Sequence, residues 1–347
     1  MQPTFFTHNE IVDVISDVNP FSNFLLNFFG QEYLSPDEQI NFDKIADDKR
    51  IAVFVNPRIP GEVIKQRGYQ VNSYKPGYIK DKRTIDPKHV FKRRAGQPMN
   101  SAMSPSDRYA ATVIDLSIIQ VTALYRRLEL MAAQLLLNGT YDMIGDGINV
   151  NIDFARNADN TIALAGANTW TSTNSAVSPI DDIDEWLTRV TAPVTSIVFG
   201  KHAWKAFRKD PKFKDQVSIE ATLGMQNLTQ MPQQNGMQDV VYRGELTGAG
   251  GVRLYTYTGT YEDPKSGLET LFVPDDAVML LPDGSKGYQC YSPIWDSEAN
   301  FETLPYFMKN WSEKDPGLPY LLLQSSPMLA HAKINSTLAA RTGADGT

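Results

Sequence analysis

A single apolar repeat between Ser104 and Gly139 sets the scale of the fold. Apolar residues recur in it at alternating steps of four and three, the spacing of one face of an α-helix. They are Ile114, Ile118, Val121, Tyr125, Leu128, Ala132 and Leu135. Ser104 and Asp107 have capping-box spacing, Pro105 takes the first helical position, and Gly139 is a typical stop. The repeat therefore predicts one helix of roughly 32 residues, about 48 Å long, that serves as a spine.

This predicted helix is several times longer than the average of about 11–12 residues, so much of the fold must be arranged along it. A coiled coil is the alternative interpretation, but sustained charge pairs at the flanking heptad positions are few. The chain has 347 residues, 42% of them hydrophobic. Such a chain is long enough for about two domains and apolar enough to bury a sizeable core.

Positive charge is concentrated in one short part of an acidic chain. Residues 61–94 contain ten Lys/Arg and three Asp/Glu, a local charge of +7. Because the whole chain carries −7, the other residues sum to −14. Such asymmetry indicates that this part meets an oppositely charged surface.

We expect residues 51–98 to form an extended β-hairpin that contains this basic segment. Strand-like runs are separated by Pro-Gly at 76–77 and Asp-Pro at 86–87, and few positions could form a core. An isolated two-stranded hairpin is marginal in water, so we expect it to lie on an acidic neighbouring copy. The candidate contact residues are Arg67, Lys75, Lys80, Lys82, Arg83, Lys92, Arg93 and Arg94.

Two other interpretations of the basic segment stay open. The charges could simply be solvated, without a role. They could also bind nucleic acid, with Tyr69, Tyr74 and Tyr78 as stacking residues. The −14 of the other residues argues against nucleic acid, since it would repel phosphate.

An aromatic cluster follows near the N-terminus, in the stretch NPFSNFLLNFFG at 19–30. Its spacing is that of an apolar helical face, and so aromatic a segment is not expected to stay exposed. It either docks on its own domain or lies as an arm on a neighbouring subunit. For the second case the contact residues are Phe21, Phe24, Phe28 and Phe29.

The remaining chain predicts a compact α/β domain at about 180–290, where helical and strand-like runs alternate. The single cysteine, Cys290, excludes an intramolecular disulfide framework. The start of the sequence lacks the pattern of a secretory signal, and no apolar run approaches the roughly 20 residues of a membrane span. We therefore expect a soluble protein made in a reducing compartment, without a membrane partner.

No pattern of catalytic, cofactor-binding or metal-binding residues is evident. The four histidines share no metal-ligand spacing, and the acidic residues at 181–184 are explained by the start of a helix. No Walker, dinucleotide-binding or Gly-x-Ser-x-Gly motif occurs. We expect no enzyme activity, no cofactor and no metal.

The order of these features resembles the major capsid proteins of tailed phages, in particular the lambda-type branch. The resemblance rests on GEVIKQRG at 61–68, PGYIK at 76–80, LPYFMKNW at 304–311, DP at 315–316 and QSSPML at 324–329. These motifs are weak singly and more specific in this order, and the resemblance covers most of the chain. It is poorest at about 219–250.

The resemblance implies an α+β fold, the tailed-phage and herpesvirus major capsid fold of the Hong Kong phage type. Its expected parts are an N-terminal arm and lead-in at 1–50, an extended loop at 51–98, a peripheral domain at 99–179 with the spine helix at 104–138, an axial domain at 180–295, returning peripheral strands at 296–335, and a tail at 336–347.

The same resemblance implies hexamers and pentamers that close into an icosahedral shell around double-stranded DNA. Implied partners are other copies of the chain, a scaffolding protein, a portal, packaged DNA bound without sequence specificity, and a decoration protein in lambda-type shells. The expected location is the virion capsid, after synthesis in the host cytoplasm. The alternatives are the shell protein of a bacterial encapsulating compartment with the same fold, and a nucleic-acid-associated module that uses the basic hairpin.

Overall fold

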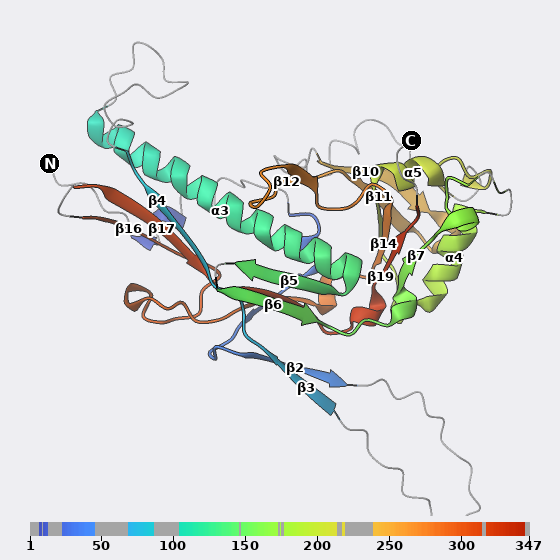
Figure 1. The fold of residues 1–347 in the computed structure, drawn as a ribbon, viewed down its shortest axis with the longest axis horizontal. Helices are drawn as coiled ribbons and strands as arrows, with labels where there is room; N and C mark the ends of the chain where they lie inside the picture. The colour runs from blue at the N-terminus through green and yellow to red at the C-terminus, as the bar shows by residue number, and fades with distance from the viewer. Residues whose placement is uncertain are drawn as a thin grey trace, which may run out of the picture.

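The computed structural model describes residues 7–8, 10–12, 23–45, 69–86, 104–145, 147–172, 174, 177–213, 217–218, 239–313 and 317–343. Its helices with defined bounds are α3 (Pro105–Asn138), α4 (Pro179–Arg189) and α5 (Lys201–Phe207). Figure 1 shows an elongated body, with α3 running from one end to a sheet at the other. Within the described ranges, no helix is both long and apolar enough to cross a membrane.

The predicted spine helix is confirmed. α3 has 34 residues and begins at a capping box, in which Ser104 Oγ accepts the Asp107 N–H at 3.1 Å and the Asp107 carboxylate accepts the Ser104 N–H at 3.2 Å. It ends at Gly139, whose φ of 74° is left-handed. This conformation costs a residue with a side chain more than it costs glycine.

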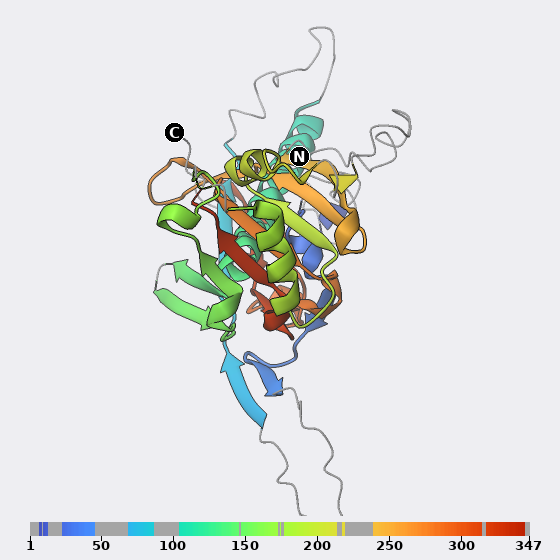
Figure 2. The same ribbon diagram turned by 90° about the vertical axis from the view of Figure 1, so that its right-hand side faces the viewer.

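A seven-stranded sheet forms the end of the molecule to which α3 runs, with strand order β7-β19-β14-β8-β11-β10-β9. The strands are β7 (Thr161–Ala163), β8 (Ser196–Phe199), β9 (Val217–Ser218), β10 (Val240–Leu246), β11 (Val252–Tyr257), β14 (Ala277–Leu281) and β19 (Leu338–Arg341). Figure 2 looks onto this end and shows α4 lying in front of the sheet.

Both faces of this sheet are covered, and β14 shows why its sequence is continuously apolar. Val278 and Leu280 point into a core formed with α4 and α5, whereas Met279 and Leu281 point into the core around α3. Successive side chains of a strand face opposite ways, so a strand between two cores needs apolar residues at every position. The sheet therefore joins two cores.

The rest of the body contains smaller sheets. One has the order β16-β17-β4 and another β1-β15-β18. The strands are β1 (Gln31–Leu34), β4 (Ile79–Thr84), β15 (Gly287–Tyr291), β16 (Phe307–Ser312), β17 (Pro319–Ser325) and β18 (Pro327–His331). Two hairpins complete the body, β5 (Thr140–Gly145) with β6 (Ile148–Asp153), and β12 (Thr260–Glu262) with β13 (Glu269–Leu271).

A two-stranded ribbon projects from the body, as Figures 1 and 2 both show. It pairs β2 (Ile40–Ile45) with β3 (Tyr69–Tyr74) in antiparallel register, with Ile45 opposite Tyr69. The hairpin expected at 51–98 is therefore corrected in its pairing. β3 pairs with the earlier strand β2, whereas β4 leaves the ribbon after Pro76-Gly77 and joins β17 in the body.

The axial and tail segments drawn from the sequence also differ from the sheet topology. The seven-stranded sheet takes β7 from before residue 180 and β19 from the expected tail. β15, expected within the axial domain, pairs instead with β1 and β18. Pairing between strands far apart in the chain leaves no local signal, so segment boundaries read from a sequence miss it.

Candidate assembly surface

The root of the β2–β3 ribbon is held by one loop of the body, residues 292–303, which we call the aromatic loop. Ser292 Oγ donates to the Glu38 carbonyl at 3.4 Å, and Thr303 Oγ1 donates to the Ser35 carbonyl at 2.7 Å. Both acceptors lie just before β2. On the other side of the ribbon, the Trp295 N–H donates to the Tyr78 hydroxyl at 3.0 Å. The aromatic loop thus contacts the chain where it enters the ribbon and where it leaves it.

A hydrogen-bond network continues from Tyr78 into the body. Its hydroxyl donates to Gln324 Oε1 at 2.8 Å, and Gln324 Nε2 donates to Asp296 Oδ2 at 2.5 Å. Lys309 Nζ lies 2.7 Å from the same Asp296 oxygen. Burial acts to raise the pKa of Asp296, but the hydrogen bonds from Lys309 and its other donors outweigh it and leave that pKa below its ordinary value. These contacts are partly shielded from water, which strengthens them and ties Tyr78, just after the ribbon, to the body.

The basic residues of the predicted contact set that the structure describes lie at the ribbon root and along β4. Lys75 pairs with Glu38 at 3.1 Å and lies 5.2 Å from the Trp295 ring centroid. Lys82 lies 3.9 Å from the Tyr320 ring centroid and 4.0 Å from a Glu313 oxygen.

Two further cations of β4 differ in how they are compensated. Arg83 forms a two-pronged pair with Asp81, whose shorter distance is 2.9 Å. Lys80 lies over the Tyr78 ring at 5.3 Å and has no carboxylate within 4.0 Å among the described residues. Part of the expected positive charge is therefore compensated within the chain. Of the four described residues of the predicted contact set, Lys80 is the one without a carboxylate within 4.0 Å among the described residues. Arg67, Lys92, Arg93, Arg94 and Phe21 lie outside the described residues.

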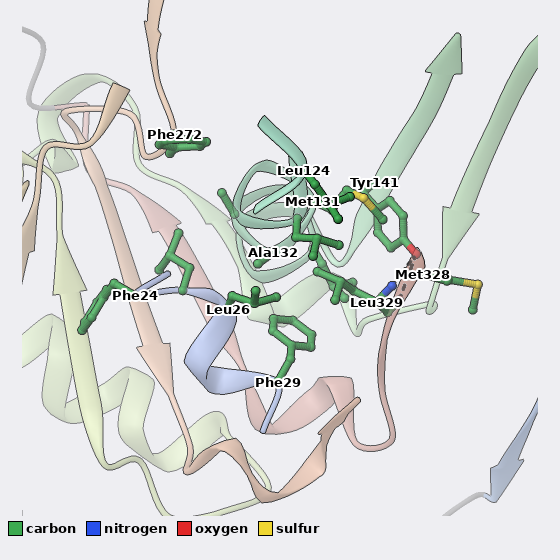
Figure 3. Close-up of a cluster of buried hydrophobic side chains, with 14 of the residues drawn as sticks. Phe24, Leu26, Phe29, Leu124, Met131, Ala132, Tyr141, Phe272, Met328 and Leu329 are labelled. Atoms are coloured by element: carbon green, nitrogen blue, oxygen red, sulfur yellow. Dashed lines mark hydrogen bonds between the residues drawn. The ribbon is translucent and has the colours of Figure 1, made fainter. Parts of the chain in front are cut away.

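The expectation that the N-terminal aromatics contact a neighbouring subunit is wrong for Phe24 and Phe29. Phe29 is 0% exposed and Phe24 is buried, and both lie in the core below α3 (Figure 3). The Phe24 ring stacks on Tyr257 of β11 at 5.9 Å, and Phe28, which is half-buried, packs on the same core. Side chains buried in the core of their own copy are not available to a second copy, so the described part of this segment, from Asn23 onward, docks on its own body.

Glu129 of α3 holds this segment in place. Its side chain is fully buried, and its carboxylate accepts the Leu25 and Leu26 N–H groups at 2.8 and 3.0 Å. The Tyr257 hydroxyl donates to it at 3.1 Å. Burial raises the pKa of Glu129 to about 7, although these three hydrogen bonds act to lower it. One carboxylate thus joins the N-terminal segment, the spine and the seven-stranded sheet.

Sequence reasoning missed both the aromatic loop and Glu129. Glu129 sits between Leu128 and Leu130 on the predicted spine, and one acidic residue on a long helix is usually solvated. Trp295 and Phe301 lie in a stretch without periodicity. The available signal for its burial was its position within the apolar repeat, next to Leu128 and near Ala132.

The described residues contain no group of three or more His, Cys, Asp or Glu side chains that could hold a metal ion. Cys290 is buried, and burial raises the pKa of its thiol to about 12, so little of it is ionised near neutral pH. The surface features that call for a role are the ribbon and its root.

A long spine helix, a sheet-based domain at one end and a strand ribbon reaching out from the body are the parts expected of the tailed-phage major capsid fold, which defines a class of shell-forming proteins. The chain belongs to the family described as Phage major capsid protein E, whose sequence pattern matches residues 7–342. It is thus a structural component of a phage virion, and proteins of this kind assemble from many copies into shells.

Known relatives and a solved structure agree with this assignment over nearly the whole chain. The chain is 26% identical to the major capsid protein of Escherichia phage lambda over 312 residues, 88% of this chain and 89% of that protein. It is 27% identical to the major capsid protein of Enterobacteria phage phi80 over 316 residues, with the same coverage. The crystal structure of a prophage capsid protein from Escherichia coli CFT073 superposes with a TM-score of 0.75 at 21% identity, covering 97% of this chain and 99% of that one. The expected fold is confirmed.

Proposed function

We propose that copies of this chain form hexamers and pentamers that close into an icosahedral shell around double-stranded phage DNA, and that the β2–β3 ribbon of each copy lies on an adjacent copy. Scaffolding protein, a portal and a decoration protein are the partners that such a shell would use. The chain would be synthesised in the host cytoplasm and act in the virion, in a structural and not a catalytic role.

The observation that carries this proposal is the ribbon. It extends away from the body in both views, and its contacts with the body are at its root (Figures 1 and 2). There Phe42 and Tyr74 approach Phe154 with ring centroids 6.1 Å away, and the Tyr74 hydroxyl donates to the Asp153 carbonyl at 2.8 Å. Two strands that stand clear of a core gain little stability alone, so a second surface is needed to cover them.

Charge supports another copy as that surface. Residues 40–74, which contain β2, β3 and the residues between them, carry +2, whereas the remainder of each chain sums to −9. A basic extension on an acidic body is complementary to the body of an identical neighbour. Head-to-tail contacts of this kind close into rings when the rotation between copies allows it. Hexamers and pentamers are such rings.

The pairing register suggests a direct test. Ile45 and Tyr69 face each other across the ribbon, so residues 46–68 can be replaced by Asn-Gly, which favours a two-residue hairpin turn. We expect this variant to fold as a monomer with an unchanged urea midpoint and to form no shells. Shells of wild-type size and yield would contradict a role in assembly for the segment that joins β2 to β3.

The β12–β13 hairpin supplies a matched control. Glu262 and Glu269 also face each other, so Asn-Gly can replace residues 263–268 in the same way. We expect this control to assemble like the wild type. It separates the loss of residues 46–68 from the general effect of shortening a hairpin.

A further inference from the structure

The aromatic loop exposes two large apolar side chains beside the root of the ribbon. Trp295 is 57% exposed and Phe301 is 64% exposed. Lys75 lies over the Trp295 ring, and Tyr78 is next to it with ring centroids 6.4 Å apart. Exposed aromatic side chains framed by charges are typical of the centre of a protein–protein contact.

These side chains project from a rigid base. The Phe301 N–H donates to the Asp296 carbonyl at 3.2 Å, and the Ile294 N–H donates to the Glu302 carbonyl at 3.0 Å. Ile294 and Ala299 are buried in a small core with Phe307. A side chain on a base that is already ordered loses less entropy when it binds, so the loop is suited to act as an anchor.

The backbone at the tip of the loop is strained. Asn300 and Phe301 have φ angles of 52° and 56°, in the left-handed region. Asparagine tolerates this conformation, but a bulky residue such as phenylalanine is rarely found there. Such strain persists where the surrounding structure enforces it, often at functional positions. Here it holds an aromatic ring in solvent.

We propose that Trp295 and Phe301 form an aromatic anchor that binds a second copy of this chain beside the root of the ribbon. This inference rests on the proposed function, since it names a surface used in the same assembly. A second copy is the occupant favoured by position. The loop contacts the chain just before β2 and just after β3, so a neighbour that covers the ribbon would also lie close to the loop. Chains of this family form shells of many copies, which places neighbours around every copy.

Phe301→Gly tests the anchor without disturbing the fold. Glycine removes the ring and accepts a φ of 56° without strain, so the unassembled chain should be at least as stable to urea as the wild type. We expect the threshold concentration for shell formation, measured by light scattering, to rise at least about 10-fold, the scale of a lost aromatic anchor.

Leu268→Ala is the matched control. Leu268 is 67% exposed on the β12–β13 hairpin, away from the aromatic loop, and its truncation should leave the threshold unchanged. A Phe301→Gly threshold equal to that of the wild type would overturn the anchor while leaving the proposed shell intact. If the wild-type chain formed no shells with or without its virion partners, the proposed function would fail, and this inference with it.

Trp295 allows a second readout in the unmodified shell. Trp170, Trp186 and Trp204 are buried and Trp311 is partly buried. All four are present in both the wild type and Trp295→Phe, so the difference in acrylamide quenching between these two proteins reports on Trp295. We expect this difference to be large for the unassembled chain and to be lost in shells of this chain alone. Equal quenching in both states would overturn the proposal. Protection only after another virion protein is added would assign the anchor to that protein instead.

Discussion

The Glu129 carboxylate accepts a hydrogen bond from the Leu25 N–H at 2.8 Å, across 104 positions of the chain. The Leu26 N–H and the Tyr257 hydroxyl complete its shell of donors. The buried charge has these neutral donors around it, and burial raises its pKa to about 7. The docking of the N-terminal segment is therefore linked to the protonation of one side chain.

Stability should depend on pH through Glu129. Its pKa is about 7 in the folded chain, against an ordinary value of 4.5 for a glutamate, so the folded state binds the proton more tightly. The contribution of Glu129 to the free energy of unfolding is fully present below pH 4.5 and is lost as the pH rises through 7. The loss amounts to about 3 kcal/mol, since each pKa unit corresponds to about 1.4 kcal/mol. Urea denaturation of the unassembled chain between pH 4.5 and 8 measures it.

Glu129→Gln is the control for that experiment, because an amide does not titrate. The variant loses one hydrogen-bond acceptor and should be less stable than the wild type at low pH. The difference between the two free energies of unfolding should shrink as the pH rises, because only the wild type loses stability. His331, whose burial lowers its pKa to about 4, changes stability in the opposite direction. It is present in both proteins, so it cancels in their difference. A difference that is constant with pH would contradict the assignment to Glu129.

Phe29→Ala should destabilise the unassembled chain. The ring is fully buried in the core below α3, and truncation of a buried phenylalanine costs about 3–5 kcal/mol. Phe28→Ala should lose less stability, because the Phe28 side chain is only half-buried. Urea denaturation monitored by circular dichroism compares the two variants. An unaffected Phe29→Ala monomer would instead support an N-terminal arm that docks on a neighbour.

Lys80→Glu should weaken assembly and spare the monomer. Its cation has no carboxylate within 4.0 Å among the described residues, so reversal should change the free energy of unfolding by less than about 0.5 kcal/mol. Shell yield should fall, and added salt should narrow the gap to the wild type because it screens exposed charges. Lys333→Glu, at an exposed lysine near the seven-stranded sheet, is the control. Equal yields for both variants would remove Lys80 from the contact surface.

Gly139→Ala should destabilise the end of the spine. A Cβ there would lie 2.7 Å from the Arg156 Cβ, and the φ of 74° disfavours any side chain. Arg156 also donates to the Leu136 carbonyl at 2.7 Å, so its displacement would uncap α3. We expect a loss of about 2 kcal/mol. Gly147 has a similar φ of 72°, but a Cβ there would meet nothing within 4 Å, so Gly147→Ala should lose clearly less stability. Thermal unfolding of the two variants measures both losses.

Local patterns made the spine predictable. Its start at Ser104 and its stop at Gly139 are set by capping chemistry within a few residues, and its apolar face by a regular repeat. The family resemblance supplied the overall architecture that such patterns cannot. Together they were sufficient for the fold class.

Pairing at long range was not predictable in the same way. β2 contains Asp43 and Lys44 and has little strand signal of its own, yet it pairs with β3 more than twenty residues later. The aromatic loop and Glu129 owe their roles to contacts across 217 and 104 positions. Such contacts depend on the assembled core, so sequence patterns could point to basic residues of the candidate surface, such as Lys75 and Lys80, but not to the aromatic loop.

Electron microscopy and light scattering of the wild-type chain over a range of concentrations test the central claim most directly. The ribbon and the aromatic anchor both require neighbouring copies, so closed particles with masses on the order of megadaltons should appear above a threshold concentration. A 38.8 kDa monomer that persists at every concentration, with Trp295 still exposed and with or without scaffolding protein, would contradict it.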